Sequence, residues 1–286
     1  MEREVSLDLS AVGRTTPPVL CQWDSNDALL YALAIGAGQE DPSRDLTFTT
    51  ENSDGIQQRV FPTYASVLTD FVAAATPDIG PIEMAHVVHA EQSVEVRRTL
   101  PTSGSMRVTT EVKHIFDKGS GALVVVEASG WLPDDEASPS ITSRSSIFIK
   151  GEGGFGIRSP KSAWSVPDRA PDALLHSQSR PDQALLYRLT GDRNPLHSDP
   201  SFAARAGFDR PILHGMCTFG IVGRVLLDFA CDGEPEKFLA MNARFSSPVY
   251  PGDLLTVCVW REANEIIFRA LSPSGIVLDR GSLTTQ

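Results

Sequence analysis

Tyr187-Arg-Leu-Thr-Gly-Asp-Arg-Asn-Pro-Leu-His197 is the segment that determines the local fold around two polar side chains, Asp192 and His197. Asn194-Pro195 forces a turn, because the residue before a proline is pushed out of the helical region. Gly191 is typical of the position just after a helix, where left-handed backbone is favoured. The segment therefore predicts a tight bend that interrupts a helical region.

Short helices are predicted on both sides of this bend. The preceding helix begins near Pro181, and the following one has Asp199 as its N-cap with Pro200 as its first helical residue. Asp192 and His197 both lie inside the bend, five positions apart. Their side chains can therefore converge on one point.

Outside this region, alternating and β-branched residues predict strands. The predicted strands are residues 93–96, 106–112, 122–127, 145–149, 254–260, 265–271 and 277–283. Each strand block follows a helix-like segment, residues 63–75 in the first half and 216–230 in the second. A helix followed by antiparallel strands, twice, at an offset of about 150 residues predicts two α+β units of common design.

The segment between the halves is rich in Gly, Ser and Pro. Gly151-Glu-Gly-Gly-Phe-Gly156 lacks the spacing of a phosphate-binding glycine loop. We therefore interpret residues 151–180 as a linker between an N-terminal unit, residues 1–150, and a C-terminal unit, residues 181–286.

Composition excludes several classes of protein. A net charge of -11 argues against a nucleic-acid partner, and no apolar run has the roughly 18 residues that a membrane helix needs. The beginning of the chain is charged, so a secretory signal is not expected. The four cysteines are far apart, without metal-binding spacing, which favours free thiols in the cytoplasm.

Asp192 and His197 suit acid–base chemistry. His197 comes just before a helix N-terminus, whose positive dipole end favours the neutral imidazole. The alternative is that Asp192 caps a turn and His197 is simply a packed or surface histidine. The spacing of the two residues alone does not decide between these readings.

The residues around the pair carry a resemblance to a known family. Tyr187 to His197, together with Phe202-Ala, Ala206-Gly-Phe and Pro211-Ile-Leu-His-Gly-Met-Cys-Thr-Phe-Gly220, closely resembles the hydratase 2 signature of the MaoC-like dehydratases. This family includes the hydratase portion of peroxisomal multifunctional enzyme type 2. Matches in the first half are Ala32-Leu-Ala-Ile-Gly-Ala-Gly38, His89-Ala-Glu-Gln92, Asp117-Lys-Gly-Ser-Gly121 and Gly153-Gly-Phe-Gly156.

The resemblance covers nearly the whole chain and implies an α+β double hot-dog fold. In this fold, two curved antiparallel sheets are each wrapped around a long central helix, and the chain usually pairs into a homodimer. Residues 63–75 and 216–230 would be the central helices. The N-terminal unit has no copy of the signature, so it would be non-catalytic and would accommodate the acyl chain.

The resemblance also implies roles for the residues of the bend. Asp192 and His197 would hold one water and transfer its protons, and which is acid and which is base stays open. Asn194 would orient the water or the catalytic groups, or it only forms the turn. Gly215 would donate its backbone N–H to the developing oxyanion, or its missing side chain only permits close packing. His214 beside it reads as structural.

Coenzyme A is a polyanion, so an acidic protein must supply local cations for it. By resemblance, the residues that contact the substrate are His89, Ala90, Lys118, Arg193, Pro195, Leu196 and Arg244. Relatives carry glycine where this chain has Ala90, and Lys118 reads almost as well as a solvated turn lysine. Coenzyme A is part of the substrate, so neither a separate cofactor nor a metal is expected.

The sequence thus predicts (R)-specific hydration of trans-2-enoyl-CoA to (R)-3-hydroxyacyl-CoA in fatty acyl metabolism. One alternative is an (R)-3-hydroxyacyl dehydratase that acts on carrier-protein substrates and uses the same pair in reverse. Another is a non-catalytic acyl-CoA-binding hot-dog protein. A hot-dog thioesterase is disfavoured, because the chain carries no independent thioesterase signature.

Overall fold

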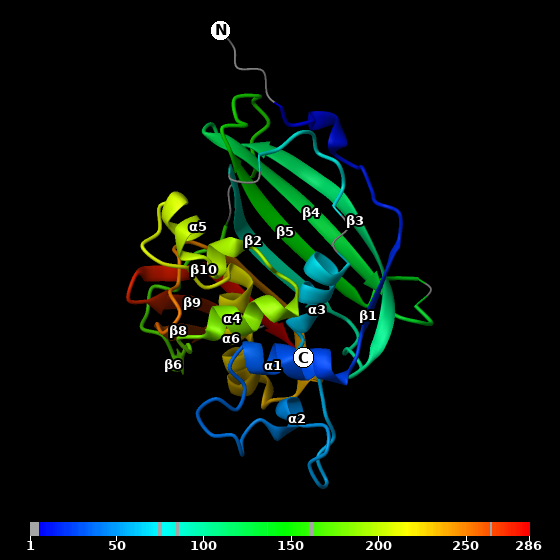
Figure 1. Ribbon diagram of the computed structural model, residues 1–286, viewed down its shortest axis with the longest axis vertical. Coiled ribbons are helices and arrows are strands. Elements are labelled where there is room, and N and C mark those ends of the chain that lie inside the picture. The colour runs from blue at the N-terminus through cyan, green and yellow to red at the C-terminus, as the bar shows by residue number, and fades with distance from the viewer. Residues whose placement is uncertain (1–5, 74–75, 84–85, 136, 161–162, 264) are drawn as a thin grey trace.

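The computed structural model describes residues 6–73, 76–83, 86–135, 137–160, 163–263 and 265–286. In these residues ten strands form one sheet, in the order β1-β3-β4-β5-β2-β7-β10-β9-β8-β6 (Figure 1). The strands are β1 (Val19–Trp23), β2 (Val87–Val96), β3 (Gly104–Asp117), β4 (Gly121–Trp131), β5 (Ile141–Lys150), β6 (Ala173–Gln178), β7 (Phe238–Phe245), β8 (Leu254–Arg261), β9 (Ile266–Ser272) and β10 (Gly275–Thr285). All neighbouring strands are antiparallel.

The two halves of the sheet repeat one topology. The order β1-β3-β4-β5-β2 in the first half corresponds to β6-β8-β9-β10-β7 in the second. The predicted internal repeat is therefore confirmed. The two sheets are not separate, because β2 pairs with β7 from Glu91–Arg244 to Glu95–Ala240. This pairing turns two exposed strand edges into one continuous sheet.

Every strand predicted from the sequence lies within an observed strand or overlaps one. The prediction did not include β1, β6 or β7. The linker prediction is wrong for residues 173–178, because they form β6 and pair with β8. This short edge strand has no β-branched residue, so composition does not distinguish it from a linker.

The glycine-rich part of the predicted linker is held in place by a carboxylate. Asp117 accepts hydrogen bonds from the backbone N–H groups of Gly119, Gly154 and Gly156. These bonds lower the pKa of Asp117 to about 2. The segment after β5 therefore folds back on the turn between β3 and β4.

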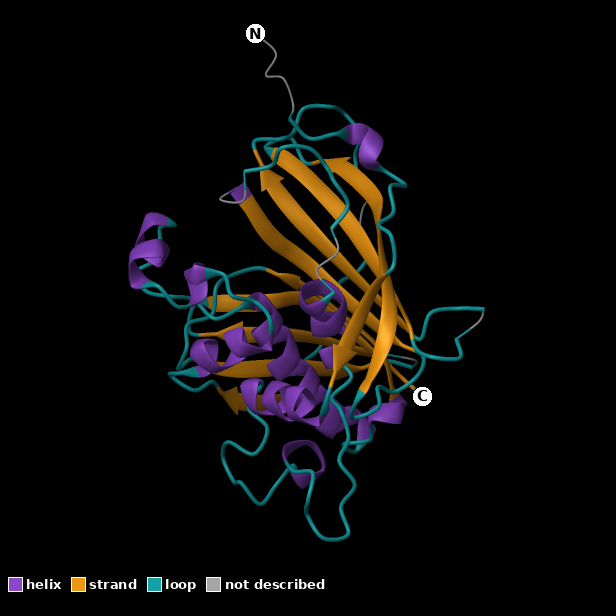
Figure 2. Cartoon of the chain, turned by 45° about the vertical axis from the view of Figure 1, so that its right-hand side comes forward, coloured by secondary structure: helices purple, strands orange, loops and turns teal. Residues whose placement is uncertain are grey.

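The helices lie on one face of the curved sheet (Figure 2). They are α1 (Ser25–Ala34), α2 (Leu46–Thr49), α3 (Tyr64–Val67) continued by a π-helical segment (Leu68–Val72), α4 (Gln183–Tyr187), α5 (Pro200–Arg205) and α6 (Gly215–Cys231). The 3-10 turns are Leu9–Ala11, Arg188–Thr190, Pro195–His197 and Pro235–Lys237. No helix in the described part of the chain is both long enough and apolar enough to cross a bilayer.

The two central helices differ in length. The prediction for residues 216–230 is confirmed by α6, which has 17 residues. The prediction for residues 63–75 is confirmed only from Tyr64 to Val72, and residues 74–75 lie outside the described part. The N-terminal unit therefore has a much shorter described helix over its concave face than the C-terminal unit.

Two glycines let α6 pack closely against the N-terminal unit. A Cβ atom added at Gly220 would lie 2.6 Å from Ile35 Cγ2, and one at Gly223 would lie 2.5 Å from Thr63 Cγ2. Both distances are far below normal van der Waals contact. The helices of the two units consequently share one apolar core.

We expect Gly220→Ala to lower the free energy of unfolding by about 1–3 kcal/mol, the usual cost of overpacking a core. The buried neighbours of Gly220, Ile35 and Tyr31, leave the new methyl group no room. Denaturant unfolding measures the change. Asp228→Ala, at an exposed position of the same helix, is the control and should change stability by less than about 0.5 kcal/mol. Equal stability of the two variants would contradict the packing argument.

Candidate active site

The bend between α4 and α5 has the form that the sequence predicts. Gly191 ends the helical region with a φ of 143°, which only glycine adopts readily. A Cβ atom at this position would also lie 3.0 Å from Phe71 Cβ, so the bend packs directly against the N-terminal unit. Asp199 caps α5 by accepting hydrogen bonds from Ser201 and Phe202.

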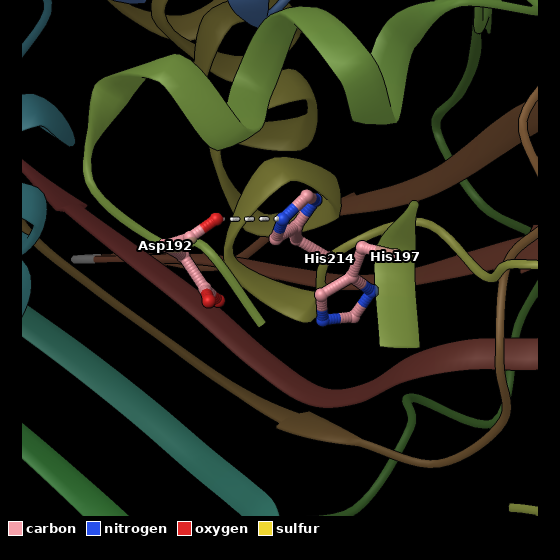
Figure 3. A group of neighbouring side chains, drawn as sticks. All are labelled: Asp192, His197 and His214. Atoms are coloured by element: carbon pink, nitrogen blue, oxygen red, sulfur yellow. Dashed lines mark hydrogen bonds between the residues drawn. The ribbon is translucent and has the colours of Figure 1, made fainter. Parts of the chain in front are cut away.

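Asp192, His197 and His214 form the centre of the site (Figure 3). One carboxylate oxygen of Asp192 and one ring nitrogen from each histidine lie within 4.8 Å of one another. Asp192 and His197 come from the bend, and His214 is the residue before α6. Asp192 is half-buried, while both histidines are buried.

His197 has a defined orientation. Its Nδ1 lies 2.9 Å from the carbonyl oxygen of Ile212, so Nδ1 carries the hydrogen and donates it. In the neutral ring, Nε2 is then the proton-accepting nitrogen. Burial holds the pKa of His197 below its usual value of 6.5, although the bond to Ile212 and the charge of Asp192 oppose this shift. The expected neutral form of His197 is therefore favoured mainly by burial of the ring.

His214 supports both members of the pair. Its Nε2 donates to the backbone oxygen of Asp192 at 3.3 Å, and its ring stacks on that of His197 with centroids 3.8 Å apart. The ring of Tyr187 also lies against His214, with centroids 4.9 Å apart and the ring planes tilted by 50°. Burial, followed by the neighbouring His197, lowers the pKa of His214 to about 2, so this ring stays neutral.

The stacking of the two histidine rings bears on whether Asp192, His197 and His214 suit a metal ion. A metal ion lies in the plane of each imidazole that binds it, because the nitrogen lone pair lies in that plane. The rings of His197 and His214 are tilted by only 30° at a separation of 3.8 Å, so their planes do not meet at bonding distance from both rings. The arrangement suits proton transfer better than metal binding.

Asn194 has a structural partner within the bend. Its Oδ1 accepts from the backbone N–H of Leu196 at 3.0 Å, and its own N–H donates to Asp192 Oδ1 at 3.0 Å. The side chain is exposed. Asn194 thus caps the 3-10 turn that places His197, as the turn-former reading predicts, and its predicted role toward water stays a prediction.

We expect Asn194→Ala to lower the free energy of unfolding by about 1 kcal/mol, because it removes a capping acceptor. Asn194→Asp keeps that acceptor and should retain most of the stability. Denaturant unfolding of both variants measures the difference. Equal losses in the two variants would contradict the capping role.

Gly215 and His89 of the N-terminal unit both lie against the ring of Phe245. A Cβ atom at Gly215 would lie 3.2 Å from the Phe245 ring, and His89 contacts the same ring edge-on at 4.8 Å between centroids. Gly215 is the first residue of α6, so its N–H has no acceptor within the helix. The structure therefore brings His89, from β2, to the same region as the predicted oxyanion donor.

The other residues that are predicted to contact the substrate differ in position and in exposure. Ala90 occupies a bulge in β2, where the register with β5 shifts between His89 and Glu91. Such a bulge leaves backbone groups unpaired beside a site. Arg193 and Pro195 are exposed on the bend, and Leu196 is half-buried there.

Lys118 and Arg244, which are predicted to bind coenzyme A, are both exposed on the surface of the protein. Lys118 is exposed in the turn between β3 and β4, hydrogen-bonds Ser159, and lies at the end of the sheet where β2 begins. Arg244 is exposed on β7 between the core residues Ala243 and Phe245. Strand alternation therefore places Arg244 on the face opposite to the Phe245 ring. Contact of either cation with coenzyme A stays a prediction.

The contacts of His214 agree with the structural role that the sequence predicts, but the sequence does not predict its stacking on His197, 17 positions away. Phe245 is not predicted at all. Phe245 carries no polar group that would mark it. Only its place in Ala-Arg-Phe-Ser-Ser-Pro, just before the strand-rich C-terminal block, could have drawn attention to it.

Fold and site together define a class: a double hot-dog protein with an aspartate–histidine pair beside the N-terminus of its second central helix. Family models give the same answer. The MFE-2 hydratase 2 N-terminal domain matches residues 21–151, and the MaoC like domain matches residues 162–273. The chain belongs to the MaoC-like dehydratase family, in the hydratase 2 group.

Curated relatives of known name span the chain. The 3-hydroxyacyl-thioester dehydratase Y of Mycobacterium tuberculosis is 41% identical over 98% of both chains. Enoyl-CoA hydratase ChsH3 of the same organism is 40% identical over 94% of both. The mouse peroxisomal multifunctional enzyme type 2 is 36% identical over 91% of this chain, which corresponds to 36% of that enzyme.

Solved structures agree on the fold. A MaoC-like dehydratase from Phytophthora capsici is similar with a TM-score of 0.86 and 30% identity, over 98% of both chains. A double hotdog protein from Mycobacterium tuberculosis has a TM-score of 0.55 at 16% identity, over 96% of both chains, which supports the fold alone.

Proposed function

We propose that this protein is an (R)-specific 2-enoyl-CoA hydratase, which converts trans-2-enoyl-CoA to (R)-3-hydroxyacyl-CoA. The observation that carries the proposal is the convergence of Asp192 and His197 in one bend, within 4.8 Å, beside the start of α6. Relatives named enoyl-CoA hydratase support the hydratase assignment over the alternatives.

Hydration needs an activated water, a proton for C2, and stabilisation of the enolate oxygen that forms between these steps. A water held between Asp192 and His197 bonds through its oxygen to C3 and gives one proton to the member of the pair that acts as base. That proton then passes from the pair to C2, so both groups return to their starting protonation states and the net change is addition of one water.

The backbone amide of Gly215 fits the third requirement. It lies at the N-terminus of a 17-residue helix, where the dipole favours negative charge. The thioester oxygen becomes an oxyanion in the transition state, and Gly215 N–H would donate to it. His89 and the Phe245 ring would border the thioester on the side of the N-terminal unit.

The direct test is the ultraviolet absorbance of the conjugated thioester. Adding the protein to crotonyl-CoA or to a longer trans-2-enoyl-CoA should remove this absorbance, and chiral analysis should identify the (R)-3-hydroxy product. No change in absorbance with any chain length would contradict the proposal and favour a binding protein. A product of (S) configuration would contradict the stereochemical part alone.

A 3-hydroxyacyl-thioester dehydratase is the second candidate, because one close relative carries that name; the thioester could then be attached to a carrier protein in place of coenzyme A. The chemistry is the same reaction in reverse. Comparing kcat/KM on matched coenzyme A and carrier-protein thioesters distinguishes the two. We favour coenzyme A.

Other parts of the proposal concern the surroundings of the site. We propose that Lys118, Arg193 and Arg244 attract coenzyme A, with no separate cofactor or metal, and that the protein is a cytoplasmic homodimer. The four cysteines are unpaired, which is usual in a reducing compartment. Light scattering of the purified protein tests the dimer, and salt dependence of KM in single alanine variants tests the three cations.

A further inference from the structure

His214 is in contact with both members of the proposed catalytic pair (Figure 3). Its Nε2 lies 3.3 Å from the backbone oxygen of Asp192, and its ring lies on the ring of His197 with centroids 3.8 Å apart. The next residue along the chain is Gly215, whose backbone N–H is the proposed oxyanion donor. One side chain therefore connects the groups that the proposed hydration requires.

The tautomer of His214 is fixed by Asp192. A carbonyl oxygen only accepts hydrogen bonds, so Nε2 of His214 carries the ring hydrogen. Burial, and next the neighbouring His197, lower the pKa of His214 to about 2, so the ring carries no second hydrogen at neutral pH. Its Nδ1 is therefore an acceptor, and this atom is buried without a hydrogen bond to any described residue. The two stacked rings have opposite tautomers, because Nδ1 carries the hydrogen in His197.

The buried Nδ1 atom of His214 argues against a role in packing alone. A buried acceptor without a donor destabilises the folded protein, so such an atom in a native structure requires an explanation. Phenylalanine has a ring of similar shape and carries no acceptor. What histidine adds at this position is the Nε2–H donor, and this donor bonds Asp192. The side chain is therefore better suited to holding the site than to filling the core.

His214 is held in place from several sides. Its side chain is buried, and the ring of Tyr187 lies against it at 4.9 Å between centroids. Its backbone oxygen accepts from Thr218 N–H at 3.1 Å in the first turn of α6. The N–H of Leu213, just before it, donates to the backbone oxygen of Val249 at 2.7 Å. The ring is therefore a fixed support for the bend between α4 and α5.

The charge on His197 changes when it exchanges a proton, and the ring of His214 lies where it acts on this charge. The other ionisable group that acts on His197 in the described part of the chain is Asp192. A neutral aromatic ring has a negative π face, which attracts a cation placed on it. With a tilt of 30°, His214 presents this face to His197, so the stacking stabilises the imidazolium form. The charge of Arg188 in turn favours the neutral form of His214.

We propose that His214 is a positioning residue for the hydration: its Nε2–H holds the backbone of Asp192, and its ring face orients His197 and stabilises the imidazolium form. This inference rests on the proposed function, because it concerns the two groups that would hold the attacking water. Loss of either contact displaces one member of the pair. A displacement of about 1 Å slows a positioned reaction by about 100-fold.

Three substitutions separate the two contacts. His214→Gln keeps an N–H donor for the Asp192 oxygen and loses the ring, His214→Phe keeps a ring against His197 and loses the donor, and His214→Leu loses both. We expect kcat with crotonyl-CoA to fall about tenfold in the first two variants and about 100-fold in the third. KM should change less than about threefold, because a residue that acts through the pair affects turnover more than binding.

The matched control is His114→Leu. His114 is an exposed histidine on β3 that stacks on Phe116, so the same chemical change there also removes a stacked ring. This variant should keep the wild-type kcat. Wild-type kcat in His214→Leu would overturn the inference.

The pH profile of kcat provides a readout that lost packing alone does not move. In the wild type, kcat should decline on the acid side where His197 takes up a proton. The ring face stabilises the protonated form, so its removal lowers the pKa of His197. The acid decline should therefore move to lower pH in His214→Gln and His214→Leu and stay in place in His214→Phe. An acid decline at one pH in all of these proteins would overturn the action of the ring on His197.

A measurement on the wild-type protein decides the matter even where a variant does not fold. Nitrogen NMR of the histidine rings identifies which ring atom carries the hydrogen. We expect the hydrogen on Nε2 of His214 and on Nδ1 of His197, and His214 should not titrate across the neutral and mildly acidic range. A hydrogen on Nδ1 of His214 would overturn its contact with Asp192 and with it the positioning role.

The two proposals can fail separately. Absence of hydration with any trans-2-enoyl-CoA contradicts the proposed function, and the ring nitrogens of the resting protein still show whether His214 holds Asp192. Hydration by the wild type together with wild-type kcat in His214→Leu contradicts the positioning role alone.

Discussion

Asp192→Asn should lower kcat/KM for a trans-2-enoyl-CoA by about 10²- to 10⁴-fold, the scale of a lost general acid–base group. The amide has the size of the carboxyl group but exchanges no proton with water. The bend itself should survive, because an amide oxygen can still accept the hydrogen bond that Asn194 N–H gives to Asp192 Oδ1. Steady-state kinetics with crotonyl-CoA measures the loss.

The matched control for this variant is Asp209→Asn. Asp209 is an exposed acid in the loop between α5 and α6, close in sequence to the site. The same chemical change there should leave kcat/KM near the wild-type value. Unfolding curves of both variants should match the wild type. Near-normal activity of Asp192→Asn would refute the catalytic role of this carboxylate.

His197→Gln should cause a loss of similar size, about 10²- to 10⁴-fold. Glutamine approximates the length of the side chain and keeps a donor that can reach Ile212 O, but its amide cannot accept a proton at neutral pH. His176→Gln, at an exposed position on β6, is the control and should keep full activity. A His197→Gln enzyme with wild-type kcat/KM would exclude His197 from proton transfer.

The wild-type pH profile adds an independent measurement. Burial lowers the pKa of His197, so the imidazole is neutral at pH 7 and takes up a proton only as the pH falls through that lowered value. Activity that needs its accepting nitrogen should hold at neutral pH and decline on the acid side below the usual histidine range. The residual activity of His197→Gln should not show this decline.

The bend that carries Asp192 and His197 could be predicted from the sequence because its determinants are local. A glycine after a helix, an Asn-Pro pair and an Asp-Pro helix start each restrict the backbone within a few residues. Together they place Asp192 and His197 on one connection, as observed. Strands β2 to β5 and β8 to β10 were also predictable, because their alternation is a local pattern.

Contacts between distant segments were not predictable in this way. His214 reaches His197 only after α6 has packed behind the bend, and Phe71 meets Gly191 only when the two units join. Strand β6 has an ordinary composition and becomes a strand because the edge of β8 is available to it. Pairing across a sheet depends on the whole fold, which a single sequence read locally does not show.

The hydrogen bonds of Asp70 with Ser143 and Ser145 could not be predicted for a related reason. Thr-Asp-Phe in a helix and Ser-Arg-Ser in a strand are common sequences, and neither predicts a partner. Their proximity follows from the position of the short helical segment on the sheet of the N-terminal unit.

The hydrogen bonds between β2 and β7 make the stability of each unit depend on the other. If one unit unfolds, the border strand of the other unit loses its hydrogen-bonding neighbour. The unpaired backbone groups of that strand are then exposed and can pair with another chain. The unit that carries Asp192 and His197 and the unit that lacks them are therefore not independent modules. A destabilising substitution in the unit that lacks Asp192 and His197 would therefore lower the activity of the enzyme by destabilising the other unit.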